Sequence, residues 1–143
     1  MDDKYKKVSI GKGKQKRKVP RTYLPKELSP ADRKKQEKSI LEGKKRPKVE
    51  SFKSKRSGFV KQFEDKYGKK ITDRKFIHEN ILRYAGQDKI KAKGKGAYFS
   101  SGSRPNQNPF SWAYGRLASV IMGGKARKVD KEIWEKFSIC NFF

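Results

Sequence analysis

The sequence predicts a mainly α-helical protein: a small helical domain with a long, extended, basic N-terminal arm and irregular connectors. Apolar residues recur at helical spacing in four stretches after residue 57, each framed by residues that start or stop helices. Only 33% of the residues are hydrophobic and 38% are charged, so much of the chain buries too little apolar surface to offset its ordering entropy. We therefore expect an arm at residues 1–28, a short helix and basic connector at 29–56, the helical domain at 57–137 and an apolar tail at 138–143.

The arm, residues 1–28, is predicted to bind a partner rather than to fold by itself. Tyr23 and Leu24 lie between two prolines, Pro20 and Pro25, which favour an extended backbone that could press both side chains into a groove. The alternatives for the basic run at residues 12–18 are a nuclear-localisation signal and a solvated tail that binds nothing. The residues expected to contact the partner are Lys12, Lys14, Lys16, Arg17, Lys18, Tyr23 and Leu24.

Residues 29–56 are expected to begin as a helix. Ser29 can cap it, Pro30 suits its first position because no N–H is needed there, and Gly43 can end it. Its interior is almost entirely polar, so the helix needs support from outside itself. Residues 43–56 then form a basic connector.

The helical domain is expected to open with two helices. The first runs over residues 58–67 and ends at the glycine that follows, and the second runs over 73–84 with Thr72 as its N-cap. A weak helical turn follows at residues 88–92, and glycines then open a loop at 94–96.

The central stretch, residues 98–128, has the densest apolar and aromatic content, and the chain is organised around it. Turn-forming residues lead into a helix that Asn108 and Pro109 can start and that two glycines end. A last helix, residues 131–137, follows with Asp130 as its cap. The predicted core consists of Phe59, Phe63, Phe76, Ile77, Ile81, Trp112, Leu117, Val120, Ile121 and Trp134.

The formal net charge of +24 indicates the class of partner. Residues 1–60 hold 21 Lys and Arg against 7 Asp and Glu (+14), and residues 61–143 hold 18 against 8 (+10). Such a chain repels itself and is attracted to nucleic acid, to an anionic membrane face or to acidic protein surfaces, although nothing else indicates a membrane. The apolar tail, with Phe142 and Phe143, either closes the core or docks into a neighbour.

The single cysteine, Cys140, excludes an intramolecular disulfide and suggests a reducing compartment. No apolar run approaches the roughly 20 residues that span a bilayer, and the N-terminus lacks the apolar segment of a signal peptide. We therefore expect the protein in the cytosol, the nucleus or the interior of a virion.

Residues that carry catalysis are scarce. His78 is the one histidine, so it cannot complete a four-ligand zinc site with a single cysteine, and its surroundings are not HExxH. No GxSxG surrounds the serines within residues 100–103, and Gly94-Lys95-Gly96 lacks the spacing of a P-loop. We expect no enzyme, no cofactor, no metal and no small-molecule substrate.

Residues suited to binding are more abundant. Four lysines between residues 89 and 95 lead into Tyr98 and Phe99, and basic grooves with aromatic side chains hold single strands. The aromatics are also needed to build so small a core, the lysines also suit a solvated face, and Arg116 can equally pair with an acid inside the fold. The predicted basic patch consists of Lys89, Lys91, Lys93, Lys95, Arg104, Arg127 and Lys128.

Three strings carry a resemblance to a family. They are KGKGAYFSSGSRPNQNPFSWAYGRLASVIMGGKARKVDK, RTYLPKELSPADRKKQ and RPKVESFKSKRS. They are similar to the motifs of a small uncharacterised basic domain family found in giant and other large double-stranded DNA viruses. The resemblance covers roughly residues 21–137. It implies a late, virion-associated protein.

Two functions are predicted. The first is a non-enzymatic minor capsid protein on the inner face of the capsid of a large icosahedral double-stranded DNA virus, where its arm would staple neighbouring major and minor capsid proteins. It would reside in host cytoplasm or nucleus during assembly. The alternative is a protein that neutralises packaged genomic DNA without reading its sequence, through the basic side chains of residues 12–18, 89–95 and 127–128.

Overall fold

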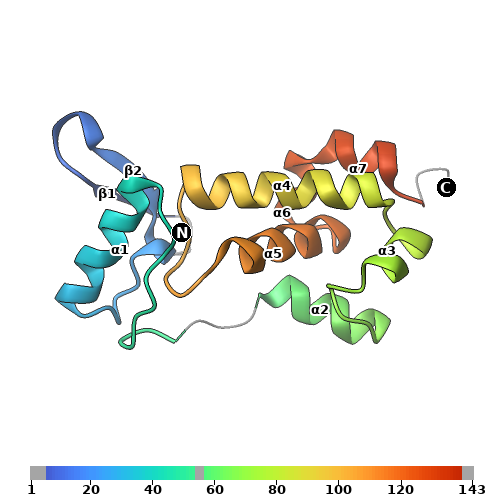
Figure 1. The fold of residues 1–143 in the computed structure, drawn as a ribbon, viewed down its shortest axis with the longest axis horizontal. Helices are drawn as coiled ribbons and strands as arrows, with labels where there is room; N and C mark the ends of the chain where they lie inside the picture. Colours follow the sequence, from blue (N-terminus) through green and yellow to red (C-terminus); the bar gives the residue numbers. More distant parts are fainter. Residues whose placement is uncertain (1–5, 54–56, 140–143) are drawn as a thin grey trace. The chain divides into compact units, whose positions relative to one another are not determined.

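The computed structural model describes residues 6–53 and 57–139. Within them the chain forms seven α-helices and one two-stranded sheet, which confirms the predicted mainly α-helical class (Figure 1). Two compact units interleave along the sequence. We call residues 6–53 with 97–109 the hairpin unit, and residues 57–96 with 110–139 the helical unit. The units therefore do not follow the predicted segments, because the chain leaves the hairpin unit and later returns to it.

The hairpin unit begins with strand β1 (Lys7–Ile10), which pairs antiparallel with β2 (Arg17–Pro20). A short 3-10 helix, η2 (Gly13–Gln15), forms the turn, and a second, η3 (Arg21–Tyr23), follows β2. The register places Val8 opposite Val19, so the two strands share one apolar face.

The prediction that residues 1–28 form an arm without a fold of its own is therefore wrong for residues 7–28. Ile10 is 3% exposed and Val19 is 2% exposed, and both join a core with residues from later in the chain. A hairpin becomes stable when its apolar face packs against another element. Here that element is helix α1 (Pro30–Glu42).

Helix α1 has the predicted ends. The Ser29 hydroxyl accepts a hydrogen bond from the Asp32 N–H, Pro30 occupies the first turn, and Gly43 ends the helix with φ +66°. The support that its polar sequence required comes from the hairpin unit itself. Ile40 packs with a cluster of buried residues, Ile10, Val19, Leu24, Leu28 and Val49.

The helical unit contains α2 (Gly58–Tyr67), α3 (Arg74–Asn80), most of α4 (Tyr84–Ser100) and of α5 (Pro109–Ile121), α6 (Lys125–Val129) and α7 (Lys131–Phe137). The predicted helices at 58–67 and 131–137 are confirmed, and so is the helix that starts at Pro109. No helix in residues 6–53 and 57–139 is long and apolar enough to cross a membrane.

Two predicted elements of the helical unit are corrected. The helix expected at residues 73–84 ends at Asn80, and Asp73 rather than Thr72 caps it, through the Phe76 N–H. The weak turn and glycine loop at residues 88–96 are instead part of α4. A Cβ at Gly94 would lie 2.8 Å from the Cα of Ala113, so this glycine allows α4 and α5 to approach closely.

The core of the helical unit contains nine of the ten predicted residues. Phe63, Ile77, Ile81, Leu117, Val120 and Ile121 are buried, while Phe59, Phe76 and Trp134 pack against them from the edge. Trp112 is only partly buried and lies outside this cluster, so its assignment to the core is wrong. Phe142, Phe143 and Cys140 lie outside the described residues.

Candidate functional site

Exposed lysines cover the hairpin. Lys12, Lys14 and Lys16 lie on its turn, and Lys18 lies on the face of β2 that points away from the core. Within the described part of the chain, none of these four ammonium groups forms an ion pair. The described residues of the hairpin unit hold 19 Lys and Arg against 5 Asp and Glu (+14), whereas those of the helical unit hold 17 against 8 (+9).

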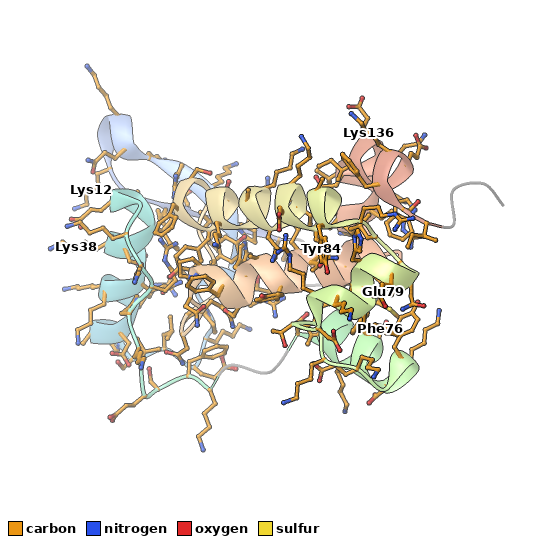
Figure 2. All side chains as sticks on the ribbon, turned by 45° about the vertical axis from the view of Figure 1, so that its right-hand side comes forward. Lys12, Lys38, Phe76, Glu79, Tyr84 and Lys136 are labelled. Carbon is orange, nitrogen blue, oxygen red and sulfur yellow. The ribbon has the colours of Figure 1, made fainter. Side chains whose placement is uncertain are left out.

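Helix α1 extends this basic surface. Lys34, Lys35 and Lys38 are exposed, and the first and last of these line a shallow depression together with Gln15 of the hairpin turn. Glu37 and Glu42 also line it, and Lys38 lies 4.0 Å from the Glu42 carboxylate. Figure 2 shows Lys12 and Lys38 projecting outward from the hairpin and from α1. We call the set Lys12, Lys14, Lys16, Lys18, Lys34, Lys35 and Lys38 the lysine surface.

Arg17 does not belong to the lysine surface. Its two terminal nitrogens donate to Ile40 O at 2.8 Å and to Ser100 O at 3.0 Å. These carbonyls lie near the C-terminal ends of α1 and α4, where partial negative charge accumulates. The prediction that Arg17 contacts a partner is therefore corrected: it faces inward beside Ile10 and ties the hairpin to two helix ends.

The predicted partner anchors Tyr23 and Leu24 are also used inside the unit. Leu24 is buried in its core, and Tyr23 packs against that core. The pKa of Tyr23 is raised, because burial of its phenol outweighs the opposing charges of Arg104 and Arg46. These two side chains therefore do not supply the free apolar contacts expected of them.

A pocket of about 320 Å³ opens in the hairpin unit. Among the described residues that line it are three cationic side chains, Arg21, Lys26 and Arg104, and one acid, Glu27. The ring of Phe52 forms part of its wall, together with Thr22 and Pro25. The predicted patch residue Arg104 is thus placed in a cationic pocket with one aromatic side.

The buried side-chain amide of Gln36 connects the pocket wall at residues 25–27 to the loop that carries Arg104. Gln36 of α1 donates through Nε2 to Tyr23 O at 3.0 Å and to Ser103 O at 2.8 Å. Because Tyr23 precedes the wall residues 25–27 and Ser103 precedes Arg104, the glutamine holds two sides of the pocket together. In the sequence this glutamine is one polar residue among many in a polar helix, so no local signal distinguishes it.

A second amide ties Phe52 to the same loop. Asn106 has φ +64°, its Oδ1 accepts from Val49 N at 2.7 Å, and its Nδ2 donates to Phe52 O at 2.7 Å. Asparagine tolerates this left-handed conformation better than most side chains. The loop that carries Arg104 and the segment that carries Phe52 are therefore held in one arrangement.

Arg46 adds a buried positive charge to the hairpin unit. It is 6% exposed, lies 4.9 Å from the centre of the Tyr98 ring, and donates to Ser39 O at 3.1 Å. It forms no ion pair with an acid among the described residues, and burial lowers its pKa. The Tyr98 hydroxyl accepts a hydrogen bond from Arg46 N and donates one to Gln107 O. Tyr98 therefore connects Arg46 to the loop that contains Gln107.

In the helical unit, the lysines of α4 have partners of several kinds. Lys91 and Lys95, one turn apart, lie 5.3 Å and 4.5 Å from the ring centres of Tyr114 and Phe110 of α5. Lys91 also approaches Asp88, at 3.8 Å, and burial lowers its pKa. Lys89 is simply exposed.

The cluster around Asp130 is structural. Arg116 Nε lies 2.8 Å from Oδ2 and its Nη2 lies 2.8 Å from Oδ1, while Lys93 Nζ lies 3.4 Å from Oδ1. Asp130 is 1% exposed and occupies the predicted N-cap position of α7, but its side chain makes no capping hydrogen bond there. The alternative that Arg116 pairs with an internal acid is confirmed.

Arg127 is likewise used inside the helical unit. It donates to Val120 O at 2.8 Å and to Ile121 O at 2.7 Å, the last carbonyls of α5, and lies 4.2 Å from the Trp134 ring centre. Lys128 is exposed. Of the seven predicted patch residues, Arg104 therefore belongs to the hairpin unit, and Arg127 and Lys93 are paired inside the helical unit.

The described residues show no group of three or more His, Cys, Asp or Glu that could hold a metal. The ring of His78 stacks on Tyr84, labelled in Figure 2, with centres 3.7 Å apart. Its Nδ1 accepts from the Tyr84 N–H at 3.0 Å, at the start of α4. His78 therefore serves as a cap for that helix.

A family model described as a family of unknown function (DUF5824) matches residues 20–134. No curated protein matches the chain, and no solved structure matches it. The matched range includes the pocket and both amides that hold its walls, but only the end of the hairpin.

Proposed function

The chain belongs to this family of unknown function (DUF5824), and we propose that it is a non-enzymatic protein that binds nucleic acid through the phosphate backbone. The observation that carries the proposal is the hairpin part of the lysine surface: Lys12, Lys14, Lys16 and Lys18 are exposed on a folded hairpin and form no ion pair within the described residues. Neutralising phosphates releases condensed counterions, which drives binding without sequence readout.

The character of this surface favours nucleic acid over an acidic protein. The large hydrophobic side chains that the described residues expose are Phe99, Phe110 and Val129, none of which lies on the hairpin or on α1. Stable protein interfaces need an apolar, desolvated centre, whereas lysines act as hydrated point charges on phosphate. The lysine surface therefore suits a polyanion whose charge is repeated along its length.

A minor capsid protein of a large double-stranded DNA virus is the second candidate. It is favoured by the exposed Phe110 (62%) and Val129 (69%) of the helical unit, which a protein partner could cover. In that case the staple would use these side chains, and the inner face of the capsid would be its location. Residues 7–28 would contribute as a folded hairpin rather than as a free arm.

The test is the salt dependence of binding to a random-sequence duplex. In one variant, Lys12, Lys14, Lys16 and Lys18 are replaced by glutamine; in a matched control, Lys61, Lys70, Lys89 and Lys128, all exposed in the helical unit, are replaced. The slope of log K against log salt should fall by roughly 0.9 for each phosphate that the variant no longer neutralises, and only in the hairpin variant. Equal weakening in both variants, or no duplex binding by the unmodified chain, would contradict the proposal.

A further inference from the structure

The pocket of the hairpin unit differs from the lysine surface because its cationic side chains line a concave site. Its volume of about 320 Å³ lies at the low end of small-ligand pockets, so it suits one compact group rather than a length of duplex. Among the described residues of its wall, Arg21, Lys26 and Arg104 outnumber the one acid, Glu27. Arginine binds phosphate oxygens through two parallel N–H groups, which a lysine cannot do.

One side of the pocket is aromatic. Phe52 packs against the core of the hairpin unit and also lines the pocket. A ring supported in this way offers a stacking surface for a nucleic-acid base, which is sequence-tolerant because every base has a π-face. A duplex keeps its bases stacked on one another, so this surface can be used only by an unpaired nucleotide.

The pocket is assembled before any ligand binds. Asn106, which lies two residues after Arg104, binds the backbone of Phe52. Gln36 binds the carbonyl of Ser103, the residue before Arg104. The aromatic and cationic walls therefore have fixed relative positions, and little conformational entropy is lost when a ligand enters. A solvated surface arginine would need no such pair of amides.

We infer that this pocket holds one nucleotide of a single strand, with its phosphate at Arg104 and Arg21 and its base against Phe52. The inference rests on the proposed function and specifies its substrate: the lysine surface attracts any nucleic-acid backbone, and the pocket selects strands with an unpaired base. An acidic peptide would use the same cations but would gain nothing from the ring.

The experiment compares the affinities of the full chain for a short single-stranded oligonucleotide and for the corresponding duplex, by fluorescence anisotropy. Phe52→Leu keeps an apolar side chain against the core, and Arg104→Gln changes an exposed residue. Each should weaken single-strand binding about tenfold and duplex binding less than about twofold. Arg104→Gln should also lower the single-strand salt slope by roughly 0.7, and Phe52→Leu should leave the slope unchanged.

Matched controls are Phe110→Leu and Arg83→Gln, an exposed aromatic and an exposed arginine of the helical unit, which should leave both affinities unchanged. Circular dichroism and thermal unfolding check the fold of every variant. If Phe52→Leu fails to fold, the exposed Arg104→Gln still decides the result. Equal weakening on single strand and duplex, or no weakening in Arg104→Gln, would overturn the inference.

The two proposals fail in different ways. If the hairpin lysine variant loses binding while Phe52→Leu and Arg104→Gln do not, the proposed function stands and the pocket inference is wrong. If polyglutamate competes as well as the oligonucleotide and Phe52→Leu has no effect, the ligand is an acidic peptide and both are wrong. If adenosine monophosphate binds, and Phe52→Leu abolishes this without changing strand affinity, the pocket takes a free nucleotide and the strand inference is wrong.

Discussion

Asn106 shows how much one side chain can organise. It satisfies backbone groups of residues 49 and 52 with a single amide while its own backbone takes φ +64°. A turn-forming asparagine is visible in the sequence, but the segment that its amide binds lies more than 50 residues earlier. Local pattern therefore predicted the turn and could not predict its long-range partner.

Replacing Asn106 should destabilise the hairpin unit. Asn106→Gly removes the three hydrogen bonds but keeps the backbone conformation, so we expect the free energy of unfolding to fall by about 2 kcal/mol. Asn106→Ala should cost about 1 kcal/mol more, because alanine resists positive φ. Urea unfolding with amide hydrogen exchange at the hairpin measures both. Equal destabilisation in the two variants would show that the backbone conformation contributes nothing.

Asp130 makes the stability of the helical unit depend on pH. Burial acts to raise its pKa, but Arg116 and Lys93 outweigh this and the pKa is lowered. A carboxyl whose pKa is lower in the folded state than in the unfolded state stabilises the fold at neutral pH. That contribution is lost as the pH falls below about 4, the unfolded value, toward the folded one.

Asp130→Asn should therefore lower the free energy of unfolding by about 3 kcal/mol at pH 7, since it leaves Arg116 without its carboxylate. The difference from the unmodified protein should shrink at pH 3. Urea titrations at the two pH values measure it. A difference that stays constant would mean that Asp130 acts through packing rather than through its charge.

At the scale of elements, α4 differs most from the structure that the sequence predicts. Its sequence contains glycines at 94 and 96, which predict a loop when each residue is judged by helix propensity. Gly94 is instead required where Ala113 of α5 approaches, and the packing between the two helices outweighs its poor propensity. Figure 1 shows the two helices running side by side.

The glycines of α4 give a direct test. Gly94→Ala would place its Cβ 2.8 Å from the backbone of Ala113, so we expect destabilisation of about 1–3 kcal/mol despite the better propensity of alanine. Gly96→Ala meets nothing within 4 Å and should stabilise the protein by about 0.5–1 kcal/mol. Thermal unfolding of the two variants would show opposite shifts; shifts of the same sign would refute the close-approach explanation.

The hairpin is a second element that local sequence pattern did not predict. Val8 and Ile10 alternate with polar residues as a half-buried strand requires, but lysines dominate the composition around them. The antiparallel register brings Val8, Ile10, Arg17 and Val19 to one face, and α1 supplies the surface that covers it. Lys18 is thereby left on the outer face, and Lys12, Lys14 and Lys16 lie on the turn, so the hairpin contributes four residues of the lysine surface.

At the scale of the whole molecule, the chain builds two units from interleaved segments. The central stretch contributes its turn to the hairpin unit and its helix to the helical unit, which explains why it carries so much of the apolar content. Contiguous segments such as 57–137 cannot describe this arrangement. Both units carry excess positive charge, and the hairpin unit combines it with a pocket that has an aromatic wall.

The sequence by itself determined the features that depend on neighbours a few residues away. These are the mainly α-helical class, the cap at Ser29, the helix that starts at Pro109, part of the apolar core of the helical unit and the excess of positive charge. Capping and helical periodicity act within about one or two turns, so they can be read without knowing the fold.

Only the tertiary structure decided which charges are used and which remain exposed. Arg17, Arg116 and Arg127 satisfy carbonyls or a carboxylate, whereas Lys12, Lys14, Lys16 and Lys18 remain outside. The pocket joins residues 21, 52 and 104, which no local pattern connects. The physical reason is that burial and electrostatic pairing depend on distances in space, and chain folding sets those distances by packing together segments far apart in sequence.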